Sequence, residues 1–158
     1  MAKHGTVLEK IAHYCAYQDR CHSEVRYKLI ELGVYGDELE EMIAYLISEK
    51  YLDEERYAQS YVRGKLKYSE WGRNKIIQGL KAKQVSEYCI KKGLKEIIPE
   101  EYEQIIWKLI NKKYESLPNS DNDWVRKQKI LRYLVQRGFE MDIVGDTYDQ
   151  YLKQLSER

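Results

Sequence analysis

A set of three apolar positions recurs along the chain at offsets of 51 and then 54 residues, and this repetition limits the possible folds more than any other feature. The three copies are Val25, Leu29 and Val34; Ile76, Leu80 and Val85; and Ile130, Leu134 and Phe139. The first two residues of each copy are four apart, so they share one face of a helix. Self-similarity at a period of about 50 residues is typical of tandem helical repeats.

A second predicted helix follows each copy, and a longer third helix follows the first two copies. Apolar pairs at helical spacing mark the second helices: Leu39 and Ile43, Ile90 and Leu94, and Val144 and Tyr148. The third helices begin near Asp53 and near Pro99, because acids in a first turn and a proline both favour a helix start. The repeating unit is therefore three helices, and the last copy lacks a clear third helix.

A unit of about 50 residues cannot bury its apolar faces alone, so neighbouring units must share a core. No stretch alternates apolar and polar residues with a period of two, so we predict no strands. The predicted fold is all-α, with tandem three-helix repeats stacked into an elongated, curved array. We place an N-terminal helix at residues 1–20 and repeats at residues 21–70, 71–119 and 120–158, the last with a short third helix or tail.

Glycines are expected to end several of these helices, since glycine readily adopts the left-handed backbone found just after a helix. Gly33, Gly93 and Gly138 lie at such positions. In the second copy, Gln84 occupies the place that Gly33 and Gly138 hold in the other two. The geometry of that turn is therefore an open question at the level of the sequence.

The composition is that of a folded, helix-rich protein, with 43% hydrophobic and 34% charged residues, nine glycines and two prolines. This excludes collagen-like and disordered chains. No window approaches the roughly 18 apolar residues of a membrane span, and residues 1–10 carry charges where a secretory apolar region would lie. The three cysteines are too few for a disulfide framework. We expect a cytoplasmic, monomeric protein with no membrane partner.

Charges are sorted along the chain, although the net charge is only +1. Residues 31–58 hold nine acids and two bases, whereas residues 60–95 hold ten bases and two acids. Residues 124–139 hold five bases and no acid. The sorting favours a molecule with basic and acidic faces that can bind a charged polymer and a protein. The alternative is that acidic and basic helices neutralise each other.

Three stretches of the sequence resemble the RecX family. The run Tyr51–Ala58 contains an aspartate, an acid, any residue, an arginine, an aromatic residue and an alanine, in that order. It is followed by Trp71–Ile76, in which a glycine and an arginine open a helix. Ser23–Leu29, with Gly33 and Val34, resembles the opening of that family's first repeat. The resemblance covers about residues 10–156.

RecX proteins are regulators of RecA, the bacterial recombinase, and are built as tandem three-helix repeats. The resemblance implies a non-enzymatic protein that binds the RecA–DNA filament, usually to limit it, in DNA repair, recombination and the SOS response. RecA is then the implied partner, with single- or double-stranded DNA as a second candidate. The alternative function is a free-standing helix-turn-helix DNA-binding regulator, which the net charge of +1 argues against.

The first of these motifs has a structural interpretation. Asp53 is expected to cap the helix that follows it, by accepting a hydrogen bond from a free backbone amide. Arg56 could pair with Asp53 or with Glu49. Tyr57 and Ala58 are expected to pack, because alanine lets another helix approach closely.

The second motif opens a basic helix. Gly72 allows a tight entry, and Arg73 has either a structural role or a role in gripping an anion or a partner's carboxylate. Tyr61, Tyr68 and Trp71 are interleaved with bases, as in surfaces that stack bases and neutralise phosphates, although tyrosines at helical spacing also pack. We expect the candidate filament-binding residues on exposed helix faces: Arg63, Lys65, Lys67, Trp71, Arg73, Lys75, Lys81, Lys83, Arg126, Lys127, Lys129 and Arg132.

Metal and catalytic chemistry are not indicated by the sequence. His13, Cys15, Cys21 and His22 do not suit zinc, because residues six apart on a helix face different ways and no second pair follows at a finger spacing. The chain has no Gly-rich phosphate loop, no GxSxG and no HExxH motif. We therefore expect no enzyme activity, no metal and no cofactor.

Overall fold

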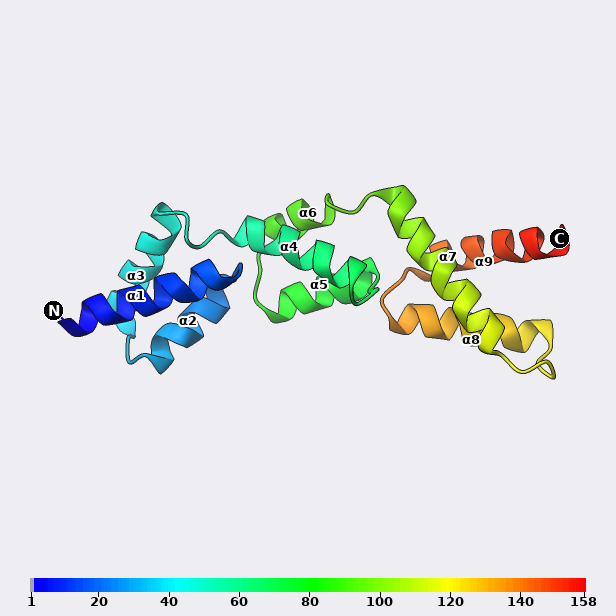
Figure 1. The fold of residues 1–158 in the computed structure, drawn as a ribbon, viewed down its shortest axis with the longest axis horizontal. Helices are drawn as coiled ribbons and strands as arrows, with labels where there is room; N and C mark the ends of the chain where they lie inside the picture. Colours follow the sequence, from blue (N-terminus) through cyan, green and yellow to red (C-terminus); the bar gives the residue numbers. More distant parts are fainter. Residues whose placement is uncertain (1) are drawn as a thin grey trace. The chain divides into compact units, whose positions relative to one another are not determined.

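Nine helices and no strand form the part of the chain that the computed structural model describes, residues 2–158 (Figure 1). They are α1 (Ala2–Tyr17), α2 (His22–Glu31), α3 (Gly36–Ser48), α4 (Glu54–Lys67), α5 (Arg73–Ala82), α6 (Glu87–Leu94), α7 (Pro99–Ser116), α8 (Asp123–Gln136) and α9 (Met141–Ser156). The predicted all-α class is confirmed. Met1 of the predicted N-terminal segment lies outside the described residues. None of the helices in the described part combines the length and the apolar character that crossing a bilayer requires.

The chain divides into two compact units, and the division passes through α4 and α5. The first unit contains the residues up to Tyr61 together with Gly79–Lys95. The second contains Val62–Gln78 and Glu96–Arg158. The first unit therefore holds α1 to α3, the start of α4, the end of α5 and all of α6, and the second unit holds the rest.

The core of the first unit is built on α1, α2 and α3, of which α2 packs against both others. One apolar cluster joins them: Val7, Ile11, Cys15, Val25, Leu29, Val34, Leu39, Ile43, Leu46 and Leu52. Most of these residues are three, four or seven positions apart, because only such positions share the inward face of a helix. The first copy of the apolar repeat lies entirely within this core.

In the second unit, α7, α8 and α9 pack against one another. Ile106, Leu109 and Ile110 of α7 are fully buried, as are Ile130 and Leu134 of α8. The packing thus groups α7 with α8 and α9. The predicted boundary at residue 120 instead placed α7 with the two helices before it. A recurring apolar pattern gives the length of a repeat but does not mark the helix at which each unit begins.

The same turn ends α2, α5 and α8. Gly33, Gln84 and Gly138 have positive φ angles of 88°, 61° and 96°. The next amide donates to the carbonyl five residues earlier in each case: Val34 to Leu29 at 2.9 Å, Val85 to Leu80 at 3.1 Å, and Phe139 to Leu134 at 3.1 Å. These are the bonds of a helix-terminating motif with a left-handed residue. Gln84 therefore adopts the backbone conformation that glycine provides in the other two turns.

Gly93 lies in the last turn of α6, but its φ is not positive, so it does not supply a left-handed turn. A Cβ at this position would lie 2.9 Å from the carbonyl oxygen and 3.1 Å from the Cβ of Ala58 on α4. Ala58 is itself fully buried. The two small residues let α4 and α6 approach closely, so packing is the reason for glycine here.

Replacing Leu29, Leu80 or Leu134 with alanine is expected to lower the free energy of unfolding by about 2–5 kcal/mol, as for other buried leucines. Each side chain is fully buried. Ile30→Ala is the matched control, because Ile30 is 54% exposed, and it should cost less than about 1 kcal/mol. Urea denaturation followed by circular dichroism measures both. Costs below about 1 kcal/mol at all three leucines would contradict this account of the core.

Gln84→Gly is expected to raise the free energy of unfolding by about 0.5–1 kcal/mol, because it removes the strain of a left-handed residue that carries a Cβ. Gly33→Gln is the reciprocal variant: no atom lies within 4 Å of a Cβ at this position, so only the backbone strain is added. It should lower stability by a similar amount. Urea denaturation measures both free energies of unfolding. If both substitutions raised this free energy, or both lowered it, the two turns would not be equivalent.

Candidate functional site

Ten of the twelve candidate filament-binding residues lie in the second unit, and Lys81 and Lys83 lie in the first. Within the second unit they come from two places, the segment from α4 to α5 and the helix α8. Residues 62–78 carry five basic side chains and one acid. We therefore describe the α4–α5 segment first and α8 afterwards.

Two lysine side chains lie over the indole ring of Trp71. The Nζ atoms of Lys65, on α4, and Lys75, on α5, are each 4.6 Å from a centroid of this ring. The Trp71 amide donates to the Lys65 carbonyl at 3.1 Å, and Trp71 is half-buried. An ammonium over an indole is attracted by the ring's quadrupole. We call Lys65, Trp71 and Lys75 the Trp71 cluster.

A backbone contact holds the start of α5 against the turn between α8 and α9. The Gly72 amide donates to the Arg137 carbonyl at 2.8 Å, and the Asn74 amide donates to the Gly138 carbonyl at 2.9 Å. A Cβ on Gly72 would overlap the Gly138 carbonyl, and a Cβ on Gly138 would overlap the Lys75 side chain. Glycine at both positions is therefore required for the two backbones to meet.

Arg73 is engaged within the chain. Its guanidinium nitrogen lies 2.9 Å from a Glu140 carboxylate oxygen, and its guanidinium carbon lies 4.1 Å from the ring centroid of Tyr102. The Tyr102 hydroxyl donates to Glu140 and accepts from the Arg73 amide at 3.0 Å. Burial raises the pKa of Tyr102, and its hydrogen bond to Glu140 raises it further, so the hydroxyl keeps its proton. Arg73 departs from the exposed face expected for it, because its side chain is only 28% exposed.

The other bases of this segment differ in their partners. A guanidinium nitrogen of Arg63 lies 3.0 Å from a Glu96 carboxylate oxygen. Lys67 Nζ lies 5.4 Å from the ring centroid of Tyr68. Within residues 2–158, neither Lys67 nor Lys75 has an acidic partner. The positive charge of these two lysines is therefore not neutralised by a neighbouring carboxylate.

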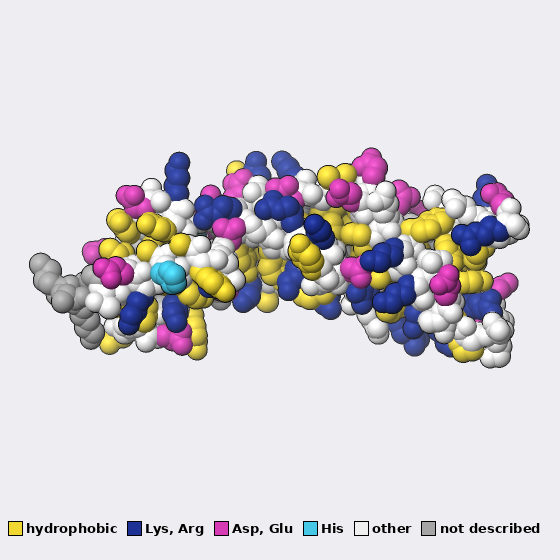
Figure 2. Space-filling model, viewed as in Figure 1, with side chains coloured by type: hydrophobic (Ala, Val, Ile, Leu, Met, Phe, Trp, Pro, Cys, Tyr) yellow, Lys and Arg dark blue, Asp and Glu magenta, His cyan; other side chains and the backbone are white. Residues whose placement is uncertain are grey.

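Three of the four candidate residues of α8 also contact other parts of the second unit. Their partners are Tyr114 and Asn119 for Arg126, Asp149 at 4.0 Å for Lys127, and Asp121 at 2.7 Å for Lys129. The Nε of Arg126 is buried without a hydrogen-bond partner, so Arg126 also departs from the expected exposed face. Arg132 is exposed and has no ion pair within the described residues. Figure 2 shows basic side chains gathered over α7 and α8, with acidic side chains among them.

The motif before α4 joins it to the N-terminal part of the first unit. The Asp53 carboxylate accepts a hydrogen bond from the Arg56 amide at 3.0 Å and so caps α4. The Arg56 side chain pairs with Asp19 at 2.7 Å. The expected pairing with the side chain of Asp53 or Glu49 is wrong. Asp19 follows α1 and is 37 residues away, so local spacing gives no sign of it.

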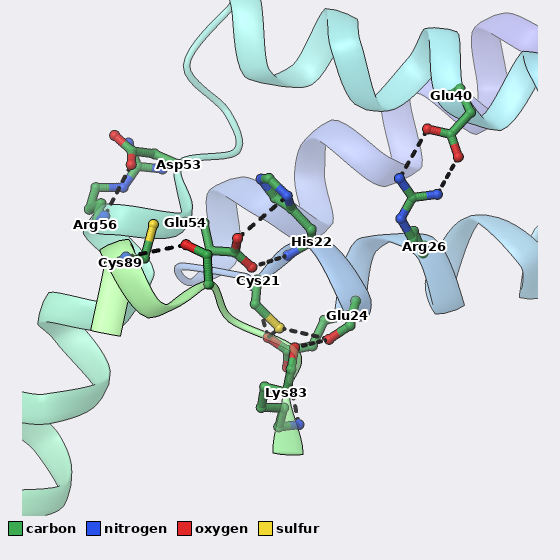
Figure 3. A network of polar contacts seen from close by, with 12 residues as sticks. Cys21, His22, Glu24, Arg26, Glu40, Asp53, Glu54, Arg56, Lys83 and Cys89 are labelled. Carbon is green, nitrogen blue, oxygen red and sulfur yellow. Dashed lines mark hydrogen bonds and ion pairs between the residues drawn. The ribbon is translucent and has the colours of Figure 1, made fainter. Parts of the chain in front are cut away.

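A second contact between a helix start and a turn lies in the first unit, where α2 meets the end of α5 (Figure 3). The Ser23 hydroxyl donates to the Lys83 carbonyl at 2.7 Å, and Lys83 Nζ lies 3.9 Å from the Glu24 carboxylate. His22 Nδ1 lies 3.6 Å from the Glu54 carboxylate. The sequence did not indicate that Glu24 pairs with Lys83 or Glu54 with His22, because the residues of each pair are more than 30 positions apart. Lys81 and Lys83 are both exposed, and Lys83 also pairs with Glu24 within the chain.

Two protein-family models match the chain. The model described as "RecX, second three-helix domain" matches residues 53–94, which contain α4 to α6. The model described as "RecX, third three-helix domain" matches residues 100–146, which contain most of α7, all of α8 and the start of α9. The chain belongs to the RecX family. The boundary between the RecX models agrees with the packing of α7 onto α8 and α9.

Relatives and solved structures agree with this family. A protein named "Regulatory protein RecX" from Clostridium perfringens (strain 13 / Type A) is 33% identical over 124 residues, which are 78% of this chain and 58% of that relative. The chain thus spans less than two thirds of the length of the curated RecX proteins it matches. The crystal structure of a regulatory protein RecX matches with a TM-score of 0.82 and 25% identity, over 93% of this chain and 73% of that one. That of RecX from Lactobacillus salivarius shares the fold, with a TM-score of 0.86 and 24% identity, over 94% and 96% of the two chains.

Gly72→Ala is expected to lower the free energy of unfolding by about 1–3 kcal/mol, because the new methyl group overlaps a backbone carbonyl that cannot move away alone. Gly64→Ala is the matched control. It lies inside α4 with no atom within 4 Å of its Cβ, so it should raise stability by about 0.5–1 kcal/mol. Urea denaturation measures both. A stabilising Gly72→Ala would show that the two backbones do not meet.

Proposed function

We propose that this RecX-family chain regulates RecA by binding the RecA–DNA filament, and that the Trp71 cluster forms part of the contact. The family supports the regulatory role, since the matched relatives carry the name regulatory protein RecX. The single observation that supports the surface is the pair of lysine ammonium groups held over one half-buried indole. Lys67, which has no acidic partner in the described part of the chain, extends the basic character of this surface.

The physical chemistry of the Trp71 cluster suits a filament made of protein and nucleic acid. Ammonium groups can neutralise phosphates or pair with acidic side chains, and an indole can stack on a base or pack against a protein. Lys65 and Lys75 come from different helices, and their contacts with Trp71 restrict both side chains before binding. Side chains that are already ordered lose less conformational entropy when a partner binds.

In this proposal the chain acts without catalysis. A protein that binds the assembled filament and free RecA with different affinities shifts the equilibrium between them by that difference. Contacts that hold the filament in a less active form would limit strand exchange and ATP hydrolysis. The role belongs to DNA repair, recombination and the SOS response in the cytoplasm, with a monomer as the acting species.

Reversing the charge of the Trp71 cluster tests the proposal. The double variant Lys65→Glu, Lys75→Glu is expected to bind RecA filaments at least about tenfold more weakly. The two new carboxylates would repel the phosphates or acidic side chains that the lysines are proposed to bind. The inhibition of RecA-dependent ATP hydrolysis should fall in parallel. Fluorescence anisotropy with labelled chain measures binding, and thermal unfolding checks that the variant folds.

Lys153→Glu is the matched control, since Lys153 is exposed on α9 and lies outside the proposed surface. It should leave binding and ATP hydrolysis unchanged. Equal loss in the control and the double variant would contradict the proposed surface. Equally tight binding of the wild-type chain to naked duplex DNA, with no effect on RecA, would favour the free-standing DNA-binding regulator instead.

A further inference from the structure

A hollow of about 560 Å³ lies between α1 and α2 in the first unit. Its walls come from α1, from the segment that follows it, from α2 and from Leu32 directly after α2, and none of the Trp71 cluster lines it. Cavities of about 300–1,000 Å³ commonly hold small organic ligands. The hollow is therefore large enough for a nucleotide, and its lining decides which ligand chemistry it suits.

Positive charge dominates the lining of this hollow. Lys10, Arg20 and Lys28 contribute permanent cations, and His13 adds an imidazole, against a single lining carboxylate, that of Glu9. Lys28 is partly compensated by Glu31, at 3.9 Å and exposed to solvent. Converging cations of this kind favour an anionic ligand. Leu32 is the only aliphatic residue of the lining, yet most of the lining surface is apolar, so the hollow suits a ligand that carries both an anionic group and a flat apolar part.

The Arg20 guanidinium is oriented before any ligand arrives. Its Nε donates to the Tyr14 carbonyl at 3.0 Å, and its guanidinium carbon lies 3.7 Å from the centroid of the Tyr14 ring. These contacts leave its two terminal nitrogens without a protein partner in the described part of the chain. Two parallel N–H groups on a fixed guanidinium match the oxygens of a phosphate.

Two tyrosines add hydrogen-bonding and stacking capacity to the lining. Burial raises the pKa of Tyr14, an effect that nearby Arg20 opposes, so its hydroxyl remains a neutral donor. Tyr17 is 76% exposed, and its ring lies at the end of α1. An exposed ring beside a cationic hollow offers a face on which an aromatic base can stack.

We propose that this hollow binds a nucleotide unit, with Arg20 holding the phosphate and Tyr17 stacking on the base. The same chemistry can come from a free nucleoside phosphate or from one nucleotide of a nucleic-acid strand. The site is separate from the proposed RecA contact, because all its residues lie between Glu9 and Leu32, in α1, in α2 or directly after one of these helices. Its test therefore needs no RecA.

Fluorescence anisotropy of two probes tests the site on the whole chain: N-methylanthraniloyl-ADP for a free nucleotide, and a short fluorescein-labelled oligothymidylate for a strand. Arg20→Gln is expected to weaken binding of at least one probe about tenfold or more, because a charge-assisted bond to phosphate is lost. Lys153→Gln is the matched control and should leave both affinities unchanged, as Lys153 is exposed on α9.

The pattern of losses identifies the source of the nucleotide. Weaker binding of the ADP probe by Arg20→Gln supports a free nucleotide as the ligand. Weaker binding of the oligonucleotide alone supports a nucleotide within a strand. Binding of neither probe by the wild-type chain, or equal losses in Arg20→Gln and Lys153→Gln, overturns the proposal. Lys10→Gln with Tyr17→Leu changes only exposed side chains and provides a second variant if Arg20→Gln fails to fold. It too should weaken binding, and unchanged affinity there overturns the proposal.

Discussion

The left-handed turn that follows α2, α5 and α8 is the constraint on which the rest of the structure depends. Each of these helices ends two residues after a fully buried leucine, and the amide five residues after that leucine closes the turn onto its carbonyl. The backbone of two of these turns also receives the start of an earlier helix. The Gly138 carbonyl accepts the Asn74 amide, and the Lys83 carbonyl, next to Gln84, accepts the Ser23 hydroxyl. One local conformation thus both closes a helix and joins neighbouring repeats.

The two contacts between a helix start and a turn use different chemistry at equivalent positions 51 residues apart. In the first unit the buried Cys21 precedes α2, and the contact runs through side chains, with Glu24 turned toward Lys83. In the second unit Gly72 takes the place of Cys21, and the backbones themselves meet. Lys75 takes the place of Glu24 and lies over Trp71 instead. Because the Gly72 backbone makes the contact by itself, Lys75 is not needed for it and is available to bind a partner.

Apolar positions and local caps were predictable from the sequence, because both depend on spacing along a single helix. The nine residues of the apolar repeat are all buried, and Asp53 caps α4 through an amide three residues away. The partners of Arg56 and Arg73 were not predictable, since they lie 37 and 67 residues away and are brought near only by packing. The left-handed conformation of Gln84 was left open by the sequence, because glutamine prefers a negative φ.

The hollow lined by Arg20 was equally hidden in the sequence. Its α1 residues and Lys28 of α2 meet only because α1 and α2 pack through Ile11, Cys15 and Leu29. A cluster of His13, Tyr14, Tyr17 and Arg20 within eight residues is the signal that could have pointed to it. That signal is weak alone, because tyrosines and bases at helical spacing usually belong to ordinary surfaces.

Amide hydrogen–deuterium exchange of the chain, with and without RecA filaments on single-stranded DNA, tests the central claim most directly. Exchange near the Trp71 cluster reports both the glycine contact and the proposed surface. The account predicts that filaments slow exchange across residues 64–76, beyond the protection already given by the Gly72 and Asn74 hydrogen bonds. Unchanged exchange there, with new protection confined to the acidic residues 37–55, would contradict it.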